Sequence, residues 1–125
     1  MAKKVLIIED EESLRHMFAS MLKTNGFEVE TAENGELGFK KVKQWDPDLI
    51  LLDLLMPVMD GYDVLKRLKS EDEGGHIPVI VLTSLSRGEE ERKAKLLGAD
   101  DFLRKDDVHL QDIIDKIGKL IGKKE

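Results

Sequence analysis

The chain has 125 residues, 41% of them hydrophobic, which is enough material for one compact domain and too little for two ordinary ones. A formal net charge of −6 disfavours broad contact with nucleic acid or anionic lipid as the main activity. The chain contains no cysteine, which excludes disulfides, thiolate metal sites and thiol nucleophiles, and it has no apolar run long enough for a signal peptide or a membrane span. We therefore expect one cytoplasmic domain over residues 1–125, without nucleic-acid binding or membrane insertion.

The hydrophobic pattern predicts five strands that alternate with five helices. In the first half of the chain, we expect a strand over 5–8, a helix over 14–22, a strand over 27–31, a helix over 34–45 and a strand over 49–52. In the second half, we expect a helix over 62–68, a strand over 78–82, a helix over 87–97, a strand over 101–104 and a helix over 110–121.

Three of the predicted strands, 5–8, 49–52 and 78–82, are wholly apolar, as is typical of strands buried on both faces of a parallel sheet. The segment 27–31 alternates apolar and polar residues and the segment 101–104 is short, so we place both at sheet edges. Right-handed crossovers with helices on both faces then predict an α/β fold, a doubly wound five-stranded parallel sheet of flavodoxin-like order 2-1-3-4-5. Its ligand crevice is expected between the first and third strands.

Reactive side chains follow the strands that surround this crevice. Glu9 and Asp10 follow the first strand, and Asp53 follows the third. Thr83 follows the fourth strand and Lys105 the fifth. Crowded carboxylates repel one another unless a cation intervenes, and oxygen ligands with open positions suit Mg²⁺, which accepts a phosphate. Since Lys105 can neutralise phosphoryl oxygens and Thr83 can donate a hydrogen bond to them, the sequence predicts phosphoryl transfer onto an aspartate.

These residues and the loop Met56-Pro57-Val58-Met59-Asp60-Gly61 strongly resemble the receiver domains of two-component response regulators, over essentially the whole chain. The separations between the reactive residues are also similar to those of the family. The resemblance implies that Asp53 is the phosphoacceptor, phosphorylated by a sensor histidine kinase or a phosphotransfer protein. It implies that Mg²⁺ is held by Asp10, Asp53 and the Leu55 backbone carbonyl, with Glu9 acting through water. Such a protein catalyses only its own phosphorylation and dephosphorylation, so it is not otherwise an enzyme.

The resemblance also implies a conformational switch. Thr83 would move toward the phosphoryl group, and an aromatic side chain on the fifth strand, matched here by Phe102, would turn inward. Phe102 lacks the hydroxyl of the commoner Tyr, so a hydrogen bond that could latch one rotamer is missing. The switch would reshape the surface formed by the fourth helix, fifth strand and fifth helix. The chain ends after its fifth helix, so we expect a stand-alone receiver with no output domain that signals through an unknown downstream protein. The alternative is that the sequence is a fragment of a longer regulator.

Two features depart from the family pattern. Lys105 is followed by Asp106 instead of proline, and a cis bond before a non-proline residue costs about 2.5–4 kcal/mol, so we expect a trans or strained loop. A trans bond could change how Lys105 approaches the phosphoryl group. Leu55 and Leu85 occupy positions where polar side chains can position hydrolytic water, which predicts slow self-dephosphorylation.

Other interpretations remain open. A degenerate receiver would bind proteins without accepting a phosphoryl group, and the Lys105-Asp106 pair supports this alternative. A hydrolase of the haloacid-dehalogenase type would need a second carboxylate two residues after its nucleophile, where this chain has Leu55. Thr83 could simply cap the fourth helix, and the acids after the first strand could favour the N-terminus of the first helix.

Overall fold

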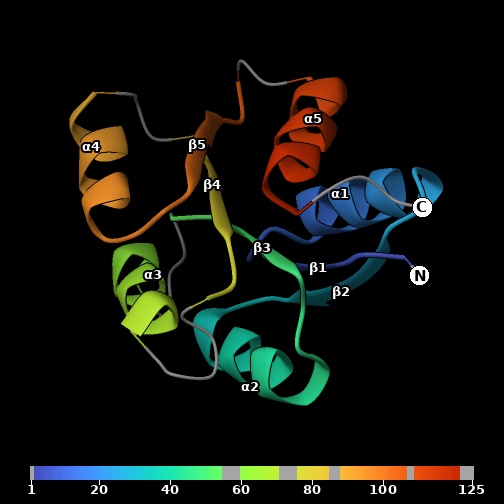
Figure 1. Cartoon of the computed structure of the whole chain (residues 1–125), viewed down its shortest axis with the longest axis horizontal. Coiled ribbons are helices and arrows are strands. Elements are labelled where there is room, and N and C mark those ends of the chain that lie inside the picture. The colour runs from blue at the N-terminus through green and yellow to red at the C-terminus, as the bar shows by residue number, and fades with distance from the viewer. Residues whose placement is uncertain (1, 55–59, 71–75, 85–87, 107–108, 122–125) are drawn as a thin grey trace.

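The computed structural model describes residues 2–54, 60–70, 76–84, 88–106 and 109–121 (Figure 1). Within these residues, five strands alternate with five helices, as the hydrophobic pattern predicts. In chain order they are β1 (Lys4–Ile8), α1 (Glu12–Thr24), β2 (Glu28–Ala32), α2 (Gly35–Trp45), β3 (Leu49–Leu52), α3 (Gly61–Ser70), β4 (Val79–Thr83), α4 (Glu89–Leu96), β5 (Asp101–Arg104) and α5 (Leu110–Ile121).

The strands form one parallel sheet in the order β2-β1-β3-β4-β5, which confirms the predicted doubly wound arrangement. Every residue of β3 and β4 is buried, as is every residue of β1 after Lys4. The edge strands β2 and β5 include partly exposed residues. The wholly apolar strands therefore lie at the centre of the sheet, where helices cover both of their faces.

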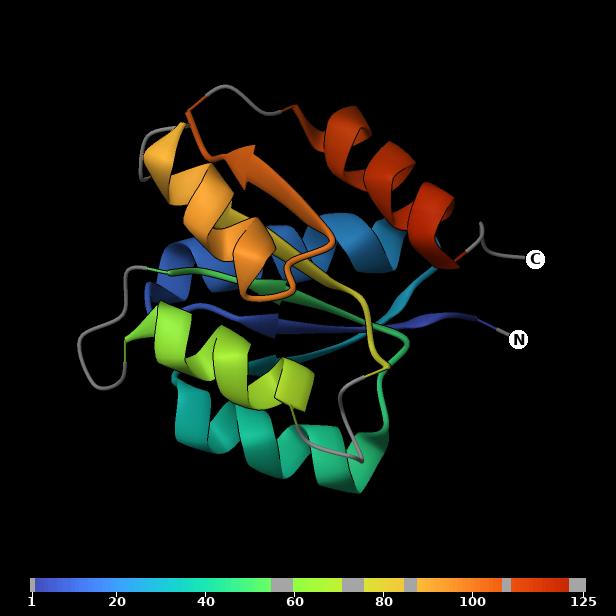
Figure 2. The same ribbon diagram turned by 60° about the vertical axis from the view of Figure 1, so that its left-hand side comes forward.

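Helices cover the two faces of the sheet in unequal numbers (Figure 2). Helices α1 and α5 pack on one face, where Phe18 and Ile117 belong to one hydrophobic cluster. Helices α2, α3 and α4 pack on the other face, where Phe39, Leu65 and Ala94 belong to a second cluster. This three-layer packing leaves the carboxyl edge of the sheet as the place where strand ends and loops converge.

Local hydrogen bonds explain several element boundaries. The side chain of Asn34 accepts a hydrogen bond from a first-turn amide at 3.0 Å, so α2 begins one residue after it. This helix ends at Trp45, because the following C-cap residue, Asp46, has a left-handed backbone with a φ of 52°. Strand β2 begins at Glu28, one residue later than predicted, because the Phe27 amide donates to the Leu22 carbonyl at the end of α1.

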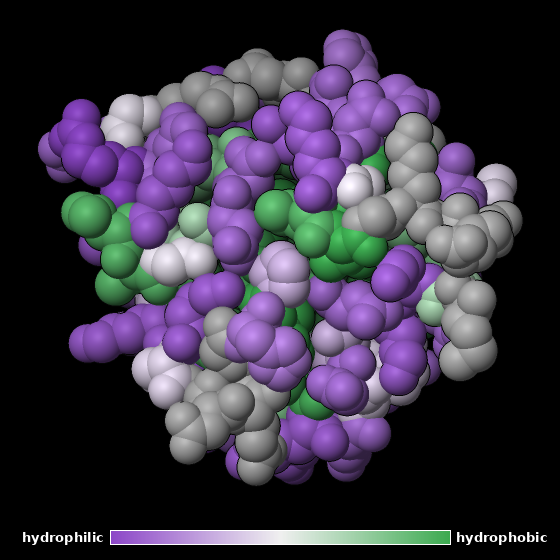
Figure 3. All heavy atoms as spheres, viewed as in Figure 1, coloured by the Kyte–Doolittle hydropathy of each residue, from purple (hydrophilic) through white to green (hydrophobic). Residues whose placement is uncertain are grey.

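Helix α4 is strongly polar, and of its eight residues only Ala94 is buried. Leu96 in its last turn is 81% exposed. Figure 3 shows hydrophobic side chains reaching the surface at the left edge of the molecule, over α4. The predicted start of this helix at residue 87 lies outside the described residues. None of the described helices has the length and apolar character needed to cross a bilayer.

Candidate functional site

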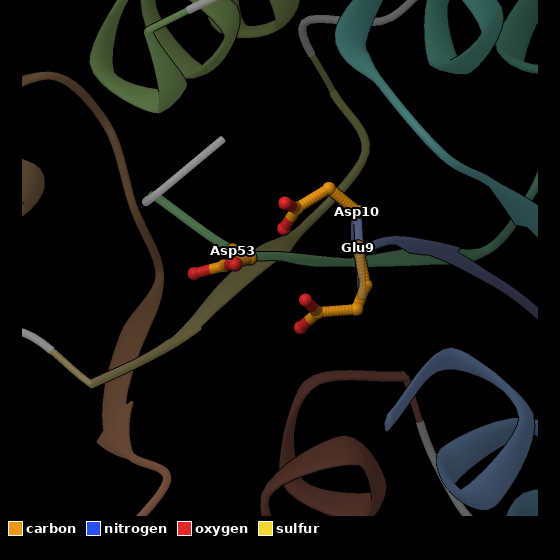
Figure 4. Close-up of side chains that lie close together, drawn as sticks. All are labelled: Glu9, Asp10 and Asp53. Carbon is orange, nitrogen blue, oxygen red and sulfur yellow. The ribbon is translucent and has the colours of Figure 1, made fainter. Parts of the chain in front are cut away.

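Three carboxylates converge at the carboxyl ends of β1 and β3 (Figure 4). Ile8 pairs with Leu52 in the parallel register, and the Asp53 amide donates to the Ile8 carbonyl at 3.0 Å. Residues that follow these two strand ends therefore become neighbours. One carboxylate oxygen from each of Glu9, Asp10 and Asp53 lies within 4.8 Å of the other two. The structure thus brings together the acidic residues that the sequence predicted.

Two of these carboxylates are buried, since Glu9 is 3% exposed and Asp53 is 4% exposed. Loss of hydration on burial is the largest effect on Glu9, and the nearby charge of Asp53 acts in the same direction. Together they raise the pKa of Glu9 from 4.5 to about 7, against the opposing hydrogen bond from Lys105. Burial thus disfavours the ionised form of Glu9, and a cation bound beside it would favour that form.

Lys105 reaches into the acidic site from the end of β5. Its Nζ atom lies 2.7 Å from Glu9 Oε1 and 3.3 Å from Asp53 Oδ2. Its backbone amide donates to the Thr83 carbonyl at 2.8 Å, which places it beside the end of β4. Burial lowers the pKa of Lys105, but the hydrogen bonds to both carboxylates and their negative charges outweigh this and raise it. Lys105 therefore stays protonated and supplies the positive charge that these carboxylates face.

The Lys105-Asp106 bond is trans, because no peptide bond among the described residues is cis. This confirms the expected geometry, and the trans bond does not keep the lysine away from the acidic residues. The Asp106 carboxylate pairs with Arg104 Nη2 at 3.0 Å. The charge of Asp106 is therefore partly offset by Arg104 on β5.

Thr83 and Phe102 occupy neighbouring strands behind the acidic site. Thr83 is fully buried at the end of β4. It does not cap the following helix, because Gly88 is the N-cap residue of α4 and provides no side-chain cap, so that alternative is wrong. Phe102 pairs with Val81 and is 1% exposed, and it belongs to the same hydrophobic cluster as Ala94 of α4. The ring thus lies inward, between the sheet and α4.

Gly61, at the start of α3, lies in close contact with Leu54, the residue after Asp53. The Gly61 amide donates to the Leu54 carbonyl at 3.2 Å, and a Cβ atom on Gly61 would lie 2.3 Å from the Leu54 Cα. Asp60 Oδ1 accepts a hydrogen bond from the Tyr62 amide at 2.9 Å and starts α3. Only glycine fits at position 61 without a shift of the backbone. The predicted magnesium ligand Leu55, the loop residues 56–59 and the position of Leu85 lie outside the described residues.

Arg15 is a site residue that the sequence pattern did not predict. Its Nη1 atom donates to the carbonyl oxygens of Glu9 at 3.0 Å and Asp10 at 3.3 Å. It thereby fixes the backbone that carries two of the three acids. The sequence does place the positive charge of Arg15 near the start of α1, where it opposes the helix dipole. Contacts with carbonyl oxygens compensate for this unfavourable position.

A link between α3 and α4 was also not predicted. The Tyr62 hydroxyl donates a hydrogen bond to Glu90, and the Nζ atom of Lys93 lies 4.1 Å from the centroid of the Tyr62 ring. Burial and the hydrogen bond to Glu90 both raise the pKa of Tyr62. Tyr62, the residue directly after Gly61, is therefore bound by two residues of α4. These contacts connect the start of α3 to α4.

Comparison with known proteins agrees with this geometry. A family model described as the response regulator receiver domain matches residues 5–118. The chemotaxis protein CheY of Halobacterium salinarum is 36% identical over 105 residues, which cover 84% of this chain and 86% of that protein. The phosphate regulon transcriptional regulatory protein PhoB of Escherichia coli is 40% identical over 107 residues, but the match covers only 46% of its length. Among solved structures, chemotaxis protein CheY4 of Vibrio cholerae superposes with a TM-score of 0.89 at 28% identity, covering 96% of this chain and 99% of that one.

Proposed function

Because the chain belongs to the response regulator receiver domain family, we propose that it is a phosphoacceptor protein in which Asp53 receives a phosphoryl group. Receiver domains are signalling modules of two-component systems, and they interact with histidine kinases or phosphotransfer proteins. The observation that carries the proposal is the position of the buried Asp53 carboxylate, within 3.3 Å of Lys105 and beside two further acids at the switch point of the sheet.

The proposed reaction is a displacement at phosphorus. A carboxylate oxygen of Asp53 forms the new bond to phosphorus while the bond from phosphorus to the donor's histidine nitrogen breaks. That nitrogen leaves with the electron pair and is protonated. Lys105 stabilises the phosphoryl oxygens by its charge, and Thr83 at the neighbouring strand end donates a hydrogen bond to one of them. Apart from accepting and losing this group, the protein has no proposed catalytic activity.

The acidic residues fit a divalent cation, because three carboxylates share a small space and a single lysine offsets only part of their charge. We propose that Asp10 and Asp53 hold Mg²⁺ and that Glu9 contributes through water. The Leu55 carbonyl is proposed as a further ligand, although it lies outside the described residues. When bound, Mg²⁺ would reduce the repulsion between the Asp53 carboxylate and the incoming phosphoryl oxygens.

The proposed output surface consists of α4, β5 and α5. A shift of Thr83 toward the phosphoryl group would change the end of β4, beside the strand that carries Phe102. Phe102 shares its cluster with Ala94 of α4, so a change in its position would reach that helix. Leu96 at the end of α4 is 81% exposed, so an apolar side chain is available on this surface for contact with a partner.

The test is intact mass spectrometry after incubation with acetyl phosphate and Mg²⁺, with the wild type and Asp53→Ala in parallel. A single phosphoryl adduct that disappears in the variant and after chelation of Mg²⁺ is the expected result. If the folded wild type binds Mg²⁺ but forms no adduct, the phosphoacceptor proposal fails. That result would favour a degenerate receiver that binds its partner without phosphorylation, the alternative suggested by Asp106.

A further inference from the structure

A cavity of about 320 Å³ lies beside the acidic site, between the end of β2 and the helices α1 and α2. This volume is at the lower end of the range for pockets that bind small molecules. Ala32 contributes a buried wall, whereas Glu33 and Lys40 are exposed. The cavity is thus a hollow open to solvent, with Ala32 at its base and charged side chains at its rim. The proposed phosphoryl-transfer reaction does not use it.

The charge of this cavity is opposite to that of the protein. Arg15, Lys40 and Lys41 line it, and Glu33 is the only carboxylate among its lining residues. The whole chain has a formal net charge of −6. Lys41 Nζ is 2.7 Å from Glu30 Oε1 and is partly neutralised by it. Arg15 and Lys40 are therefore the cations best placed to receive an anion.

The guanidinium group of Arg15 is held in place by one of its nitrogens. Its hydrogen bonds within the described part of the chain both start from Nη1 and end on the carbonyls of Glu9 and Asp10. The other edge of the guanidinium group, Nη2 and Nε, can accommodate two oxygens of a carboxylate or phosphate. An arginine fixed in this way loses little further conformational freedom when an anion binds.

Apolar surface lies next to these cations. Ala32 is 4% exposed and Leu37 is 37% exposed, and both line the cavity. The methylene groups of Lys40 and Lys41 add to this surface. A ligand that is anionic at one end and apolar at the other would therefore find both kinds of contact here, whereas a bare inorganic anion would use only one kind.

We propose that this cavity binds a small organic anion, with a carboxylate or phosphate group paired with Arg15 and Lys40 and an apolar body against Ala32 and Leu37. The proposal does not depend on phosphorylation of Asp53. Its ligand lies behind the backbone of Glu9 and Asp10, on the side where Arg15 contacts their carbonyl oxygens.

The test is a titration of the ¹⁵N-labelled full chain, followed by amide chemical shifts in buffer with EDTA. The probes are phenyl phosphate and benzoate, with inorganic phosphate and phenol as controls for charge alone and ring alone. We expect at least one of the two organic anions to cause saturable shifts at Arg15 and across residues 31–44, with clearly weaker binding of both controls. Saturation by phenyl phosphate alone identifies a phosphate site, and saturation by benzoate alone identifies a carboxylate site. Absence of saturable shifts there with both anions, or equal binding of inorganic phosphate, would overturn the proposal.

Lys40→Gln is the informative variant, because Lys40 is exposed and its loss should leave the fold unchanged. We expect it to weaken binding roughly tenfold, the loss of one charge-assisted contact. Lys43→Gln is the matched control, since Lys43 is exposed on the same helix and does not line the cavity. Equal weakening by both variants would mean that only net charge attracts the anion, and the site would be rejected.

Discussion

The Nζ atom of Lys105 lies closer to Glu9 Oε1, at 2.7 Å, than to Asp53 Oδ2, at 3.3 Å. In this arrangement the lysine pairs mainly with the acid that is not the proposed phosphoacceptor. Binding of a cation by the acidic residues would compete with this ion pair and release the lysine toward the phosphoryl oxygens. Before phosphorylation, Lys105 and Mg²⁺ are therefore expected to compete for the acidic residues. During phosphorylation, both are expected to stabilise the phosphoryl oxygens.

The raised pKa of Glu9 predicts a pH-dependent stability in buffer without Mg²⁺. Between pH 4.5, the usual pKa of the group, and its folded value of about 7, the folded protein binds more protons than the unfolded chain. The free energy of unfolding should therefore fall as pH rises through this window, by at most about 3 kcal/mol from this group. Urea denaturation of the wild type and Glu9→Gln at several pH values measures it. The difference between the two proteins should change across the window, and parallel profiles would contradict the assignment.

Substitution of Lys105 should separate metal binding from phosphorylation. In Lys105→Gln, we expect phosphorylation by acetyl phosphate to slow roughly tenfold to hundredfold, because a charge that stabilises the phosphoryl oxygens is lost. Mg²⁺ affinity, measured by calorimetry, should rise, because the lysine no longer competes for Glu9 and Asp53. Lys116→Gln is the control, since it removes the same charge from an ion pair with Asp101 at 3.0 Å. An unchanged rate in Lys105→Gln would exclude the proposed role.

Mg²⁺ should stabilise the folded protein through the acidic residues. At a concentration ten times its dissociation constant, the expected gain in unfolding free energy is about 1.4 kcal/mol. Asp10→Asn should lose most of this gain, because one of the three carboxylates becomes neutral. Asp115→Asn makes the same chemical change at an exposed position on α5 and should keep the gain. Thermal or urea unfolding with Mg²⁺ and with EDTA gives both values, and an equal gain in the two variants would place the ion elsewhere.

Gly61→Ala should destabilise the protein more than Gly88→Ala. A Cβ atom at position 61 would lie 2.3 Å from backbone atoms of Leu54, so the chain beyond Asp53 must move, at a cost of roughly 1–3 kcal/mol. At position 88 no atom of the described residues lies within 4 Å of such an atom, and the φ of +87° opposes the substitution. Urea denaturation ranks the two variants. The reverse ranking would show that the contact between Gly61 and Leu54 is easily relieved.

Slow loss of the phosphoryl group remains a prediction from the sequence, because Leu55 and Leu85 stand at positions where the family resemblance implies that polar side chains can orient water. Phosphorylated wild-type protein should decay slowly after removal of the phosphodonor. Leu55→Asn should accelerate the decay, because its amide can hold a water molecule near the phosphorus. Decay of the intact-mass adduct over time measures both rates. A wild-type half-life of seconds would contradict the prediction.

The strands, their order in the sheet and the residues at their ends follow from the sequence alone, because each depends on the pattern of a short segment. Apolar runs of four or five residues identify strands buried on both faces, so the strand order and the central position of β3 were predictable. Parallel strands end at the same edge, so residues that directly follow the strands, Asp53 and Lys105 among them, had to be near one another.

Tertiary structure decided the contacts between side chains from distant parts of the chain. Three such contacts depend on rotamers and on how helices pack against the sheet. They are the short distance from Lys105 to Glu9, the hydrogen bonds from Arg15 to the carbonyls of Glu9 and Asp10, and the hydrogen bond from Tyr62 to Glu90. Hydrophobic periodicity carries no information about these contacts, because it reports which face of an element is buried and not which polar atoms meet. The cationic cavity beside α2 has the same origin, since its walls come from three elements that only the fold brings together.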